Sequence, residues 1–273
     1  MAMLSMNETT TFRWSFEKDV AEYSAAGIPA IGIWRQKLSD CGQAGAIELL
    51  AESGLRASCL LWAGGFTGSD GRSYRESVED AADALQTAAR LQCSTLVVYS
   101  GARAGHTYNH ARRLIQSALA ELIPMAVQLG ITLAVEPMHP GCAADWTFLT
   151  SIDDTLALLE AVGNPRVKMV LDTYHLGQEP ELAQRIPAIV PHLAIVQLGD
   201  ARQPPQGEQN RCRLGEGNIP LREIVAALKS AGYDGYYDVE LLGEEIETSD
   251  YEPLYKSLLQ HAKTAFEELV GNT

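Results

Sequence analysis

An apolar run gives way to polar and aromatic residues at Met169-Val-Leu-Asp-Thr-Tyr-His-Leu-Gly177. Residues 167–171 predict a buried strand. Asp172 and His175 would then lie at its C-terminal edge, where parallel sheets bind ligands. Alternatively, Asp172 caps the next helix and His175 is an ordinary loop histidine. Three other strand-like runs end in similar polar residues, and this favours a reaction site.

Working outward from this stretch, strand-like and helix-like runs alternate along the chain. The predicted strands are 11–14, 30–34, 57–62, 95–100, 132–136, 167–171, 193–198 and 236–241. The predicted helices are 16–26, 45–53, 74–91, 110–129, 151–162, 179–190, 221–231 and 253–270. A kink or break is expected at Pro124 and an interruption near Pro187. Residues 1–10 are polar and are expected to be frayed.

Eight strand–helix units predict parallel strands joined by right-handed crossovers. A chain of 273 residues suits a (β/α)₈ TIM barrel, whose typical length is about 250 residues. The alternative is a doubly wound open sheet, but no G-x-G-x-x-G follows a first strand. Because no linker rich in Pro, Gly or Ser interrupts the pattern, we expect one domain over residues 1–273.

The composition disfavours several classes of partner and of cellular location. The net charge of −14 disfavours nucleic acid and anionic membranes as partners. The five cysteines are widely spaced without a C-x-x-C pair, which is typical of reduced thiols. No signal peptide and no membrane-spanning run is visible. We therefore expect a cytoplasmic protein with a small-molecule substrate, and homo-oligomer formation is left open.

Polar residues follow the last four predicted strands. They are Glu136, then Asp172 with His175, then Gln197 with Asp200, then Glu240. In a barrel these strand ends converge on one pocket, where carboxylates repel one another unless a cation neutralises them. Oxygen ligands suit Mg²⁺ or Mn²⁺, whereas zinc more usually gathers Cys or His. The alternative is a set of unrelated solvated carboxylates.

Five segments together carry a family resemblance. They are Leu133-Ala-Val-Glu-Pro-Met-His-Pro140, Leu171-Asp-Thr-Tyr-His175, Ile195-Val-Gln-Leu-Gly-Asp200, Asn210-Arg-Cys-Arg-Leu-Gly-Glu-Gly217 and Val239-Glu240. With them the chain resembles the sugar phosphate isomerase/epimerase family of xylose-isomerase-like TIM barrels. The resemblance covers essentially the whole chain. It is specific for the superfamily and weak for the substrate.

The resemblance implies a role for several positions. Glu136, Asp172, Gln197 and Glu240 would hold one divalent metal ion, while His175 and Arg211 would bind substrate. Many members have histidine where this chain has Gln197. An amide oxygen still coordinates Mn²⁺ or Mg²⁺, so Zn²⁺ and Co²⁺ are less expected.

The predicted site leads to a chemical hypothesis. A metal ion that chelates a carbonyl and a neighbouring hydroxyl acidifies the adjacent C–H. A carboxylate then removes the proton and leaves a metal-stabilised enediolate. We expect Glu136 and Glu240 to be this acid/base pair. Proton return to the neighbouring carbon gives isomerisation, and return to the opposite face gives epimerisation.

Three further residues are candidates for substrate contact. Trp34 and Trp62 end predicted strands, where an aromatic face can pack against sugar C–H groups, although they could equally cap the barrel core. His139 follows Glu136 by three residues and is a candidate contact as well.

Other functions remain open at this stage. A lyase would use the same site to dehydrate an inosose-like keto-polyol or to cleave a keto-sugar. A non-catalytic barrel is a remote alternative. The abasic-site endonuclease branch of the superfamily is disfavoured, because its three-zinc cluster needs many histidines and this chain has six.

Overall fold

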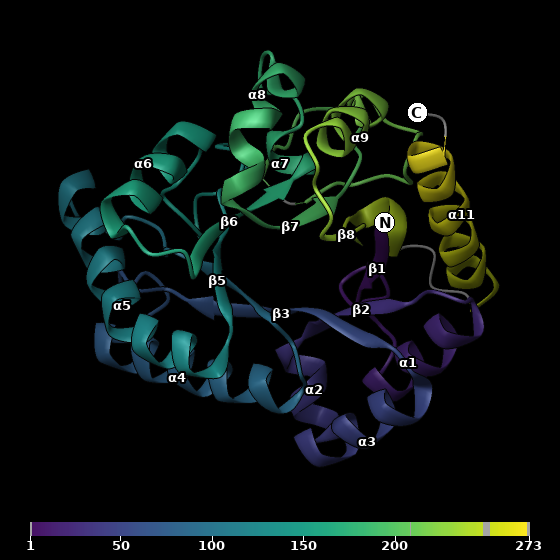
Figure 1. Ribbon diagram of the computed structural model, residues 1–273, viewed down its shortest axis with the longest axis horizontal. Coiled ribbons are helices and arrows are strands. Elements are labelled where there is room, and N and C mark those ends of the chain that lie inside the picture. The colour runs from purple at the N-terminus through teal and green to yellow at the C-terminus, as the bar shows by residue number, and fades with distance from the viewer. Residues whose placement is uncertain (1, 208, 248–251, 272–273) are drawn as a thin grey trace.

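Eight parallel strands close into a barrel with the helices outside it (Figure 1). The computed structural model describes residues 2–207, 209–247 and 252–271. The strands are β1 (Met3–Asn7), β2 (Ala30–Trp34), β3 (Arg56–Gly64), β4 (Thr95–Tyr99), β5 (Thr132–Val135), β6 (Val167–Asp172), β7 (Leu193–Leu198) and β8 (Tyr236–Val239). They pair in chain order, and β8 closes on β1. The predicted TIM barrel is confirmed.

The helices lie between the strands in the chain, except the last two, which follow β8. They are α1 (Phe16–Ala25), α2 (Arg35–Cys41), α3 (Gln43–Ser53), α4 (Tyr74–Arg90), α5 (Tyr108–Leu129), α6 (Ile152–Val162), α7 (Thr173–Leu176), α8 (Leu182–Ile189), η1 (Val190–His192), α9 (Leu221–Ser230), α10 (Glu244–Glu247) and α11 (Glu252–Gly271). Within the described residues, none of these helices is both long enough and apolar enough to cross a membrane.

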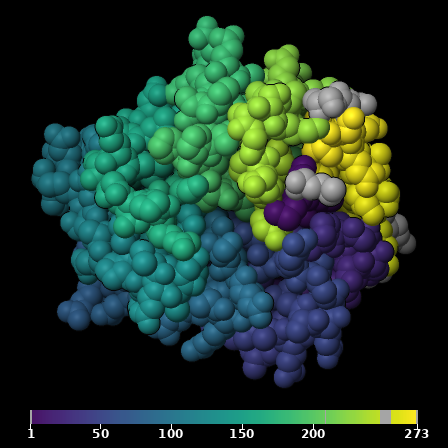
Figure 2. All heavy atoms as spheres, in the orientation of Figure 1, coloured from purple at the N-terminus to yellow at the C-terminus, as the bar shows by residue number. Residues whose placement is uncertain are grey.

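The N-terminal segment differs from the prediction. Residues 11–14 are not a strand, and residues 3–7 are not frayed but form β1, which pairs with both β2 and β8. Leu4 and Met6 pack in the hydrophobic core, while Ser5 and Asn7 are buried polar residues with side-chain hydrogen bonds. Because the residues of β1 that face the barrel interior are polar, its sequence lacks the continuous apolar run by which a buried strand is predicted. In Figure 2 the purple N-terminal segment and the yellow C-terminal helix share one side of the molecule.

Two prolines do not act as predicted. α5 continues through Pro124, and α8 continues past Pro187 to Ile189. Each proline removes a backbone donor, but the buried faces of both helices hold them against the barrel. Those of α5 include Ile115, Leu119 and Leu122. The helix predicted over 179–190 begins later, at Leu182, and α2 was not predicted.

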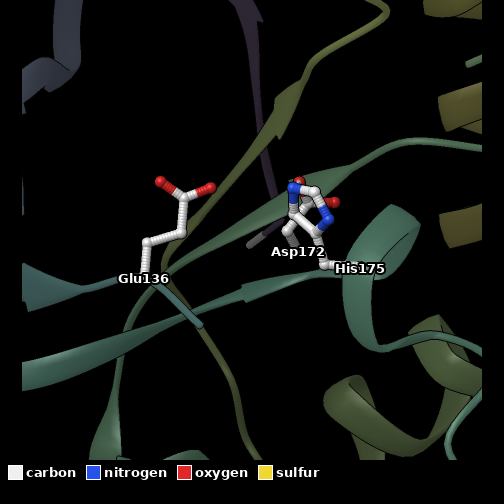
Figure 3. Close-up of side chains that lie close together, drawn as sticks. All are labelled: Glu136, Asp172 and His175. Atoms are coloured by element: carbon white, nitrogen blue, oxygen red, sulfur yellow. Dashed lines mark ion pairs between the residues drawn. The ribbon is translucent and has the colours of Figure 1, made fainter. Parts of the chain in front are cut away.

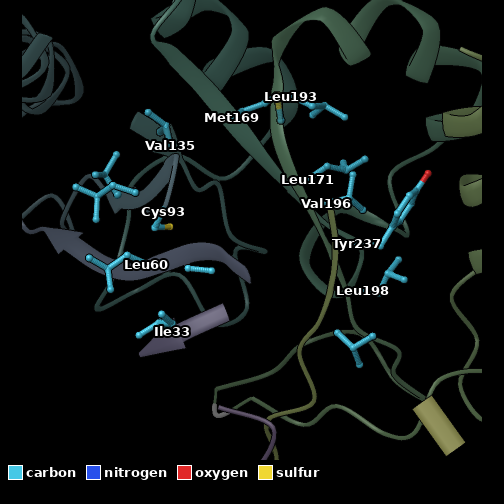
Figure 4. Close-up of a cluster of buried hydrophobic side chains, with 14 of the residues drawn as sticks. Ile33, Leu60, Cys93, Val135, Met169, Leu171, Leu193, Val196, Leu198 and Tyr237 are labelled. Atoms are coloured by element: carbon cyan, nitrogen blue, oxygen red, sulfur yellow. The ribbon is translucent and has the colours of Figure 1, made fainter. Parts of the chain in front are cut away.

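The core has two parts because successive strand residues face opposite sides of a sheet. One set, which includes Met169 and Leu171, packs in the large cluster formed with the surrounding helices (Figure 4). The other set forms a separate cluster of Cys59, Leu61, Val97, Ala134, Val170 and Ile195. These six residues come from five strands and fill the inside of the barrel. A residue that lies two positions further along the same strand therefore also faces the barrel interior.

Candidate active site

The alternation along the strands brings four predicted site residues to the barrel interior. Glu136, Asp172 and Gln197 each lie two positions after a residue of the interior cluster, and Glu240 lies two positions after the buried Asp238. Asp172 and Gln197 are register partners in β6 and β7. All four side chains are at most 2% exposed. The prediction that these strand ends converge on one region is thus supported by the barrel geometry.

The two carboxylate oxygens of Asp172 make different contacts. It is the N-cap of α7, where its Oδ1 accepts a hydrogen bond from the Tyr174 backbone N–H at 2.7 Å. The single turn of α7 then places His175 Nε2 at 3.6 Å from Asp172 Oδ2. The helix-capping role predicted as the alternative for Asp172 is therefore observed, and it leaves the other oxygen facing His175, so the role of Asp172 in a reaction site stays a prediction.

Glu136, Asp172 and His175 form a buried group that could hold a cation. Each offers one ligand atom, and these atoms lie within 4.8 Å of one another. In Figure 3 Glu136 extends from one strand end, and Asp172 and His175 lie close together beside it. Glu136 Oε2, His175 Nε2 and Gln197 Oε1 are buried without a hydrogen-bond partner among the described residues. Because such atoms are costly to bury unsatisfied, these residues fit a bound divalent metal ion.

Arg211 is wholly buried against two of the carboxylates. Its Nη2 donates to Asp172 Oδ2 at 2.6 Å, and its Nη1 is 3.6 Å from Glu240 Oε1. The guanidinium also stacks on the Tyr174 ring, 4.4 Å from its centroid. Gly199 makes room for this packing, since a Cβ there would lie 2.9 Å from Arg211 Nε. Arg211 therefore lies beside the predicted metal ligands, and its contact with substrate stays a prediction.

Gln197 links this arrangement to the last strand. Its Nε2 donates to Glu240 Oε2 at 2.7 Å, which leaves its Oε1 without a partner. The amide is thus oriented with nitrogen toward the carboxylate and oxygen available to a cation, as the ligand role predicted for Gln197 requires.

The electrostatics of the site follow from burial of like charges. Burial raises the pKa of Glu136 well above its usual value, and Glu240 and Asp172 raise it further. Burial also raises the pKa of Glu240 to about 7, although Arg211 opposes the shift. Burial lowers the pKa of His175 to about 4, so its imidazole is neutral at neutral pH. In the metal-free protein Glu240 therefore titrates near neutrality, and its acid/base role stays a prediction.

Aromatic rings continue from β2 to the mouth of the barrel. Trp34 packs on Trp62, and Trp62 packs on Trp146, with ring centroids 6.5 and 5.9 Å apart. Trp146 lines a cavity of about 690 Å³ together with Cys142, Gln209 and other loop residues. Trp34 and Trp62 lie behind Trp146 in this series, and their contact with substrate stays a prediction.

His139 and Cys142 lie in the loop between β5 and α6. His139 Nδ1 accepts from the Gly141 backbone N–H at 3.0 Å, which gives His139 a role within the loop. Cys142, which the sequence did not single out, lies with its Sγ 3.4 Å from His175 Nδ1. Substrate contact by His139 stays a prediction.

Two more buried acids were missed. Glu8 follows β1 as Glu136 follows β5, and its Oε2 accepts from the Trp34 backbone N–H at 2.8 Å. Asp238 lies inside the barrel below Glu240 and accepts from Asn7 Nδ2 at 2.8 Å. Placing the first strand at 3–7 would have put Glu8 at a strand end, so the signal was lost with β1.

Comparison with known proteins identifies the family. The model of the xylose isomerase-like TIM barrel family matches residues 20–265. The chain belongs to this family. Among relatives of known activity, this xylose isomerase-like barrel is 25% identical to an inosose isomerase of Halalkalibacterium halodurans. That match covers 66% of this chain and 64% of the relative, and the match to an L-ribulose-5-phosphate 3-epimerase of Escherichia coli, at 27% identity, covers 51% of this chain and 46% of that relative.

Solved structures of this xylose isomerase-like barrel type superimpose over nearly the whole chain. Protein SMc04130 from Sinorhizobium meliloti 1021 has a TM-score of 0.87 at 26% identity, with 96% of this chain and 98% of that chain covered. The IolI protein with a bound zinc atom has a TM-score of 0.84 at 20% identity, with 99% and 98% covered. The second likeness concerns the fold alone.

Proposed function

We propose that this protein is a divalent-metal-dependent isomerase or epimerase of a small, sugar-like polyhydroxy carbonyl compound. The observation that carries the proposal is the pair of buried, unpartnered oxygens Glu136 Oε2 and Gln197 Oε1, close to the carboxylates of Asp172 and Glu240. Membership in the xylose isomerase-like family and similarity to an inosose isomerase support it. A cytoplasmic location is part of the proposal, because all five cysteines are unpaired.

Glu136, Asp172, Gln197 and Glu240 would hold the ion, which we propose to be Mn²⁺ or Mg²⁺. Three carboxylate groups and an amide oxygen form a hard-oxygen ligand set that suits these ions. A bound ion would polarise the carbonyl group of the substrate and make the adjacent C–H more acidic. The zinc in the related IolI fold makes Zn²⁺ the ion to test against them.

Glu136 and Glu240 would be the general acid and base of the reaction. They extend from β5 and β8, and each is at most 2% exposed. Burial raises the pKa of both carboxyl groups, that of Glu240 to about 7, which favours the protonated form that an acid needs. One carboxylate removes the proton on carbon next to the carbonyl group, and a carboxylic acid returns it. Return to the same carbon from the opposite face gives an epimer, and return to the neighbouring carbon gives an isomer.

His175 and Arg211 would orient the substrate. Arg211 Nη1 has no hydrogen-bond partner among the described residues, and neither has His175 Nε2. Both nitrogens can therefore donate to substrate oxygens. Trp34, Trp62 and His139 would line the route from the cavity at the barrel mouth.

The first experiment is calorimetric titration of Mn²⁺ into the metal-stripped protein. One-to-one binding is expected in the wild type, and it should be lost or at least 10-fold weaker in Glu240→Gln, because one anionic ligand is removed. Glu267→Gln, which alters an exposed carboxylate of α11, is the matched control and should bind like the wild type. Binding that is indifferent to Glu240 would show that the four strand ends do not form the site.

The second experiment follows substrate C–H exchange in D₂O with candidate ketoses and keto-inositols. Metal-dependent incorporation of deuterium next to the carbonyl group is expected for at least one compound. Incorporation should fail in Glu136→Gln, because the proton acceptor is lost. If no compound of either class exchanges, carbanion-type acid/base chemistry at this site is wrong.

A further inference from the structure

The contact between Cys142 and His175 joins a loop to the centre of the site. Cys142 is half-buried and lines the cavity at the barrel mouth, with its Sγ 3.4 Å from His175 Nδ1. His175 is only 3% exposed, and its other nitrogen, Nε2, has no hydrogen-bond partner and is 3.6 Å from Asp172 Oδ2. The two ring nitrogens therefore face different partners, a thiol on one side and the reaction site on the other.

A neutral imidazole carries one proton, and its position decides what His175 can do. With the proton on Nδ1, Nε2 presents a lone pair and can bind a metal ion. With the proton on Nε2, His175 is a hydrogen-bond donor toward the reaction site and cannot be a metal ligand through that nitrogen. The group that faces Nδ1 normally makes the choice.

Both neighbours of the ring favour the proton on Nε2. The single S–H proton of Cys142 has two acceptors in reach, His175 Nδ1 at 3.4 Å and the backbone O of His139 at 3.5 Å. The His139 O already accepts hydrogen bonds from the backbone N–H groups of Cys142 and Ala143, at 3.0 Å each. Because His175 Nδ1 is the nearer acceptor and imidazole nitrogen is a better acceptor than thiol sulfur, S–H donation to Nδ1 is favoured. Burial raises the pKa of the Cys142 thiol, which therefore keeps its proton at neutral pH. On the other side, a protonated Nε2 faces the carboxylate Oδ2 of Asp172, which would repel a lone pair.

We propose that Cys142 is a positioning residue that holds His175 in the tautomer with the proton on Nε2, so that His175 donates to a substrate oxygen and does not bind the metal ion. The statement about substrate rests on the proposed function, whereas the tautomer is a property of the protein alone. The proposal thus gives His175 a role in substrate binding, whereas Glu136 and Asp172, the other two members of the buried group, remain the proposed metal ligands.

The loop that carries Cys142 is held in place by a second loop. Gly141 O accepts from the Gly207 backbone N–H at 2.7 Å, and Cys142 N donates to His139 O at 3.0 Å. A Cβ on Gly141 would lie 1.9 Å from Pro205 O, so only glycine permits this approach. The position of the thiol over His175 therefore depends on contact between the two loops.

Infrared spectroscopy of the metal-free protein tests the hydrogen bond directly. The S–H stretching band of Cys142 is isolated as the difference between wild type and Cys142→Ala. We expect it at lower frequency in wild type than in a His175→Phe background, because S–H···N bonding weakens the S–H bond. A band that does not move when His175 is replaced would overturn the proposal.

Nitrogen NMR of histidine-labelled wild-type protein gives a second readout without any substitution. The shifts should show His175 with Nε2 protonated and Nδ1 unprotonated, both without metal and with the diamagnetic ion Mg²⁺. A proton on Nδ1, or loss of the Nε2 proton when Mg²⁺ is added, would refute the proposal while leaving Mn²⁺ binding, and so the proposed function, intact.

Kinetics with any substrate found by D₂O exchange complete the test. Cys142→Ser retains an O–H donor and should keep KM near the wild-type value. Cys142→Ala should raise KM about 2- to 10-fold, as expected for one weakened hydrogen bond, with a smaller change in kcat. The control is Cys41→Ala, which alters a half-buried cysteine far from His175 in the chain. Equal effects of the Ser and Ala variants would contradict a donor role for Cys142.

Discussion

Arg211 is the only cation placed within hydrogen-bonding distance of Asp172 among the described residues, at 2.6 Å. In the metal-free protein Arg211→Met leaves that buried carboxylate near Glu136 and Glu240 without a counter-charge. Breaking such a pair typically costs about 3–5 kcal/mol. We therefore expect the free energy of unfolding in urea to fall by about this amount.

The matched control for Arg211 is Arg222→Met, which breaks an exposed pair. Arg222 Nη2 lies 3.5 Å from Glu268 Oε2, with side chains 65% and 57% exposed. Water screens this pair, so the expected change is about 0–1 kcal/mol. A loss for Arg211→Met no larger than for Arg222→Met would mean that the buried carboxylates do not need the guanidinium.

Asp238 gives the protein a pH-dependent stability at the residue scale. Burial raises its folded-state pKa from 3.8 to about 6. As pH rises through this window the unfolded chain loses a proton that the folded chain keeps, so stability falls, by on the order of 3 kcal/mol. Above pH 6 or so the contribution no longer changes.

Asp238→Asn carries no such proton and should lack this component of the pH profile. The measurement is urea unfolding of the metal-free proteins from pH 4 to 7.5. The difference in unfolding free energy between wild type and variant at each pH gives the contribution of Asp238. Asp145→Asn changes an exposed carboxylate and should reproduce the wild-type profile. Parallel profiles for wild type and Asp238→Asn would contradict the raised pKa.

At the scale of elements, two loops cover the site. The β5–α6 loop and the β7–α9 loop meet where Gly207 N–H donates to Gly141 O. In Gly141→Ala the new Cβ would collide with Pro205 O and separate the loops. We expect kcat/KM to fall on the order of 10- to 100-fold, since reacting groups are displaced by about 1 Å.

The strands and the helices against them should remain intact in Gly141→Ala. Hydrogen exchange should therefore rise in these two loops and not in β5 or β7. The control is Gly45→Ala in α3, where the new Cβ meets nothing closer than 3.8 Å. Exchange unchanged in both loops would show that they do not cooperate over the site.

At the scale of the whole molecule, β1 is the strand that closes the barrel, because it pairs with both β2 and β8. We propose that the chain folds as one domain. Calorimetry of the intact chain should then show a single two-state transition, and deletion of residues 2–7 should abolish it by exposing the edges of β2 and β8. Two separable transitions would contradict this. Assembly into homo-oligomers stays a prediction, which sedimentation can test.

Much of the fold could be predicted from local patterns. β2 and β7 have the predicted bounds, and the other strands after β1 differ from the predicted bounds by at most two residues at an end. These strands carry continuous apolar runs, as strands buried on both faces do. β1 was missed because Ser5 and Asn7 are polar inside a barrel whose interior also holds Asp238, and no local pattern signals a polar interior.

The sequence by itself determined seven of the eight strands, the barrel class, and the strand-end positions of Glu136, Asp172, Gln197 and Glu240, because these depend on periods of two and 3.6 along the chain. Only the tertiary structure decided which groups touch. Arg211 pairs with Asp172 across 39 residues, and Cys142 meets His175 across 33. Such contacts arise where loops from separate strands fold over one barrel end, and periodicity within one element carries no information about them.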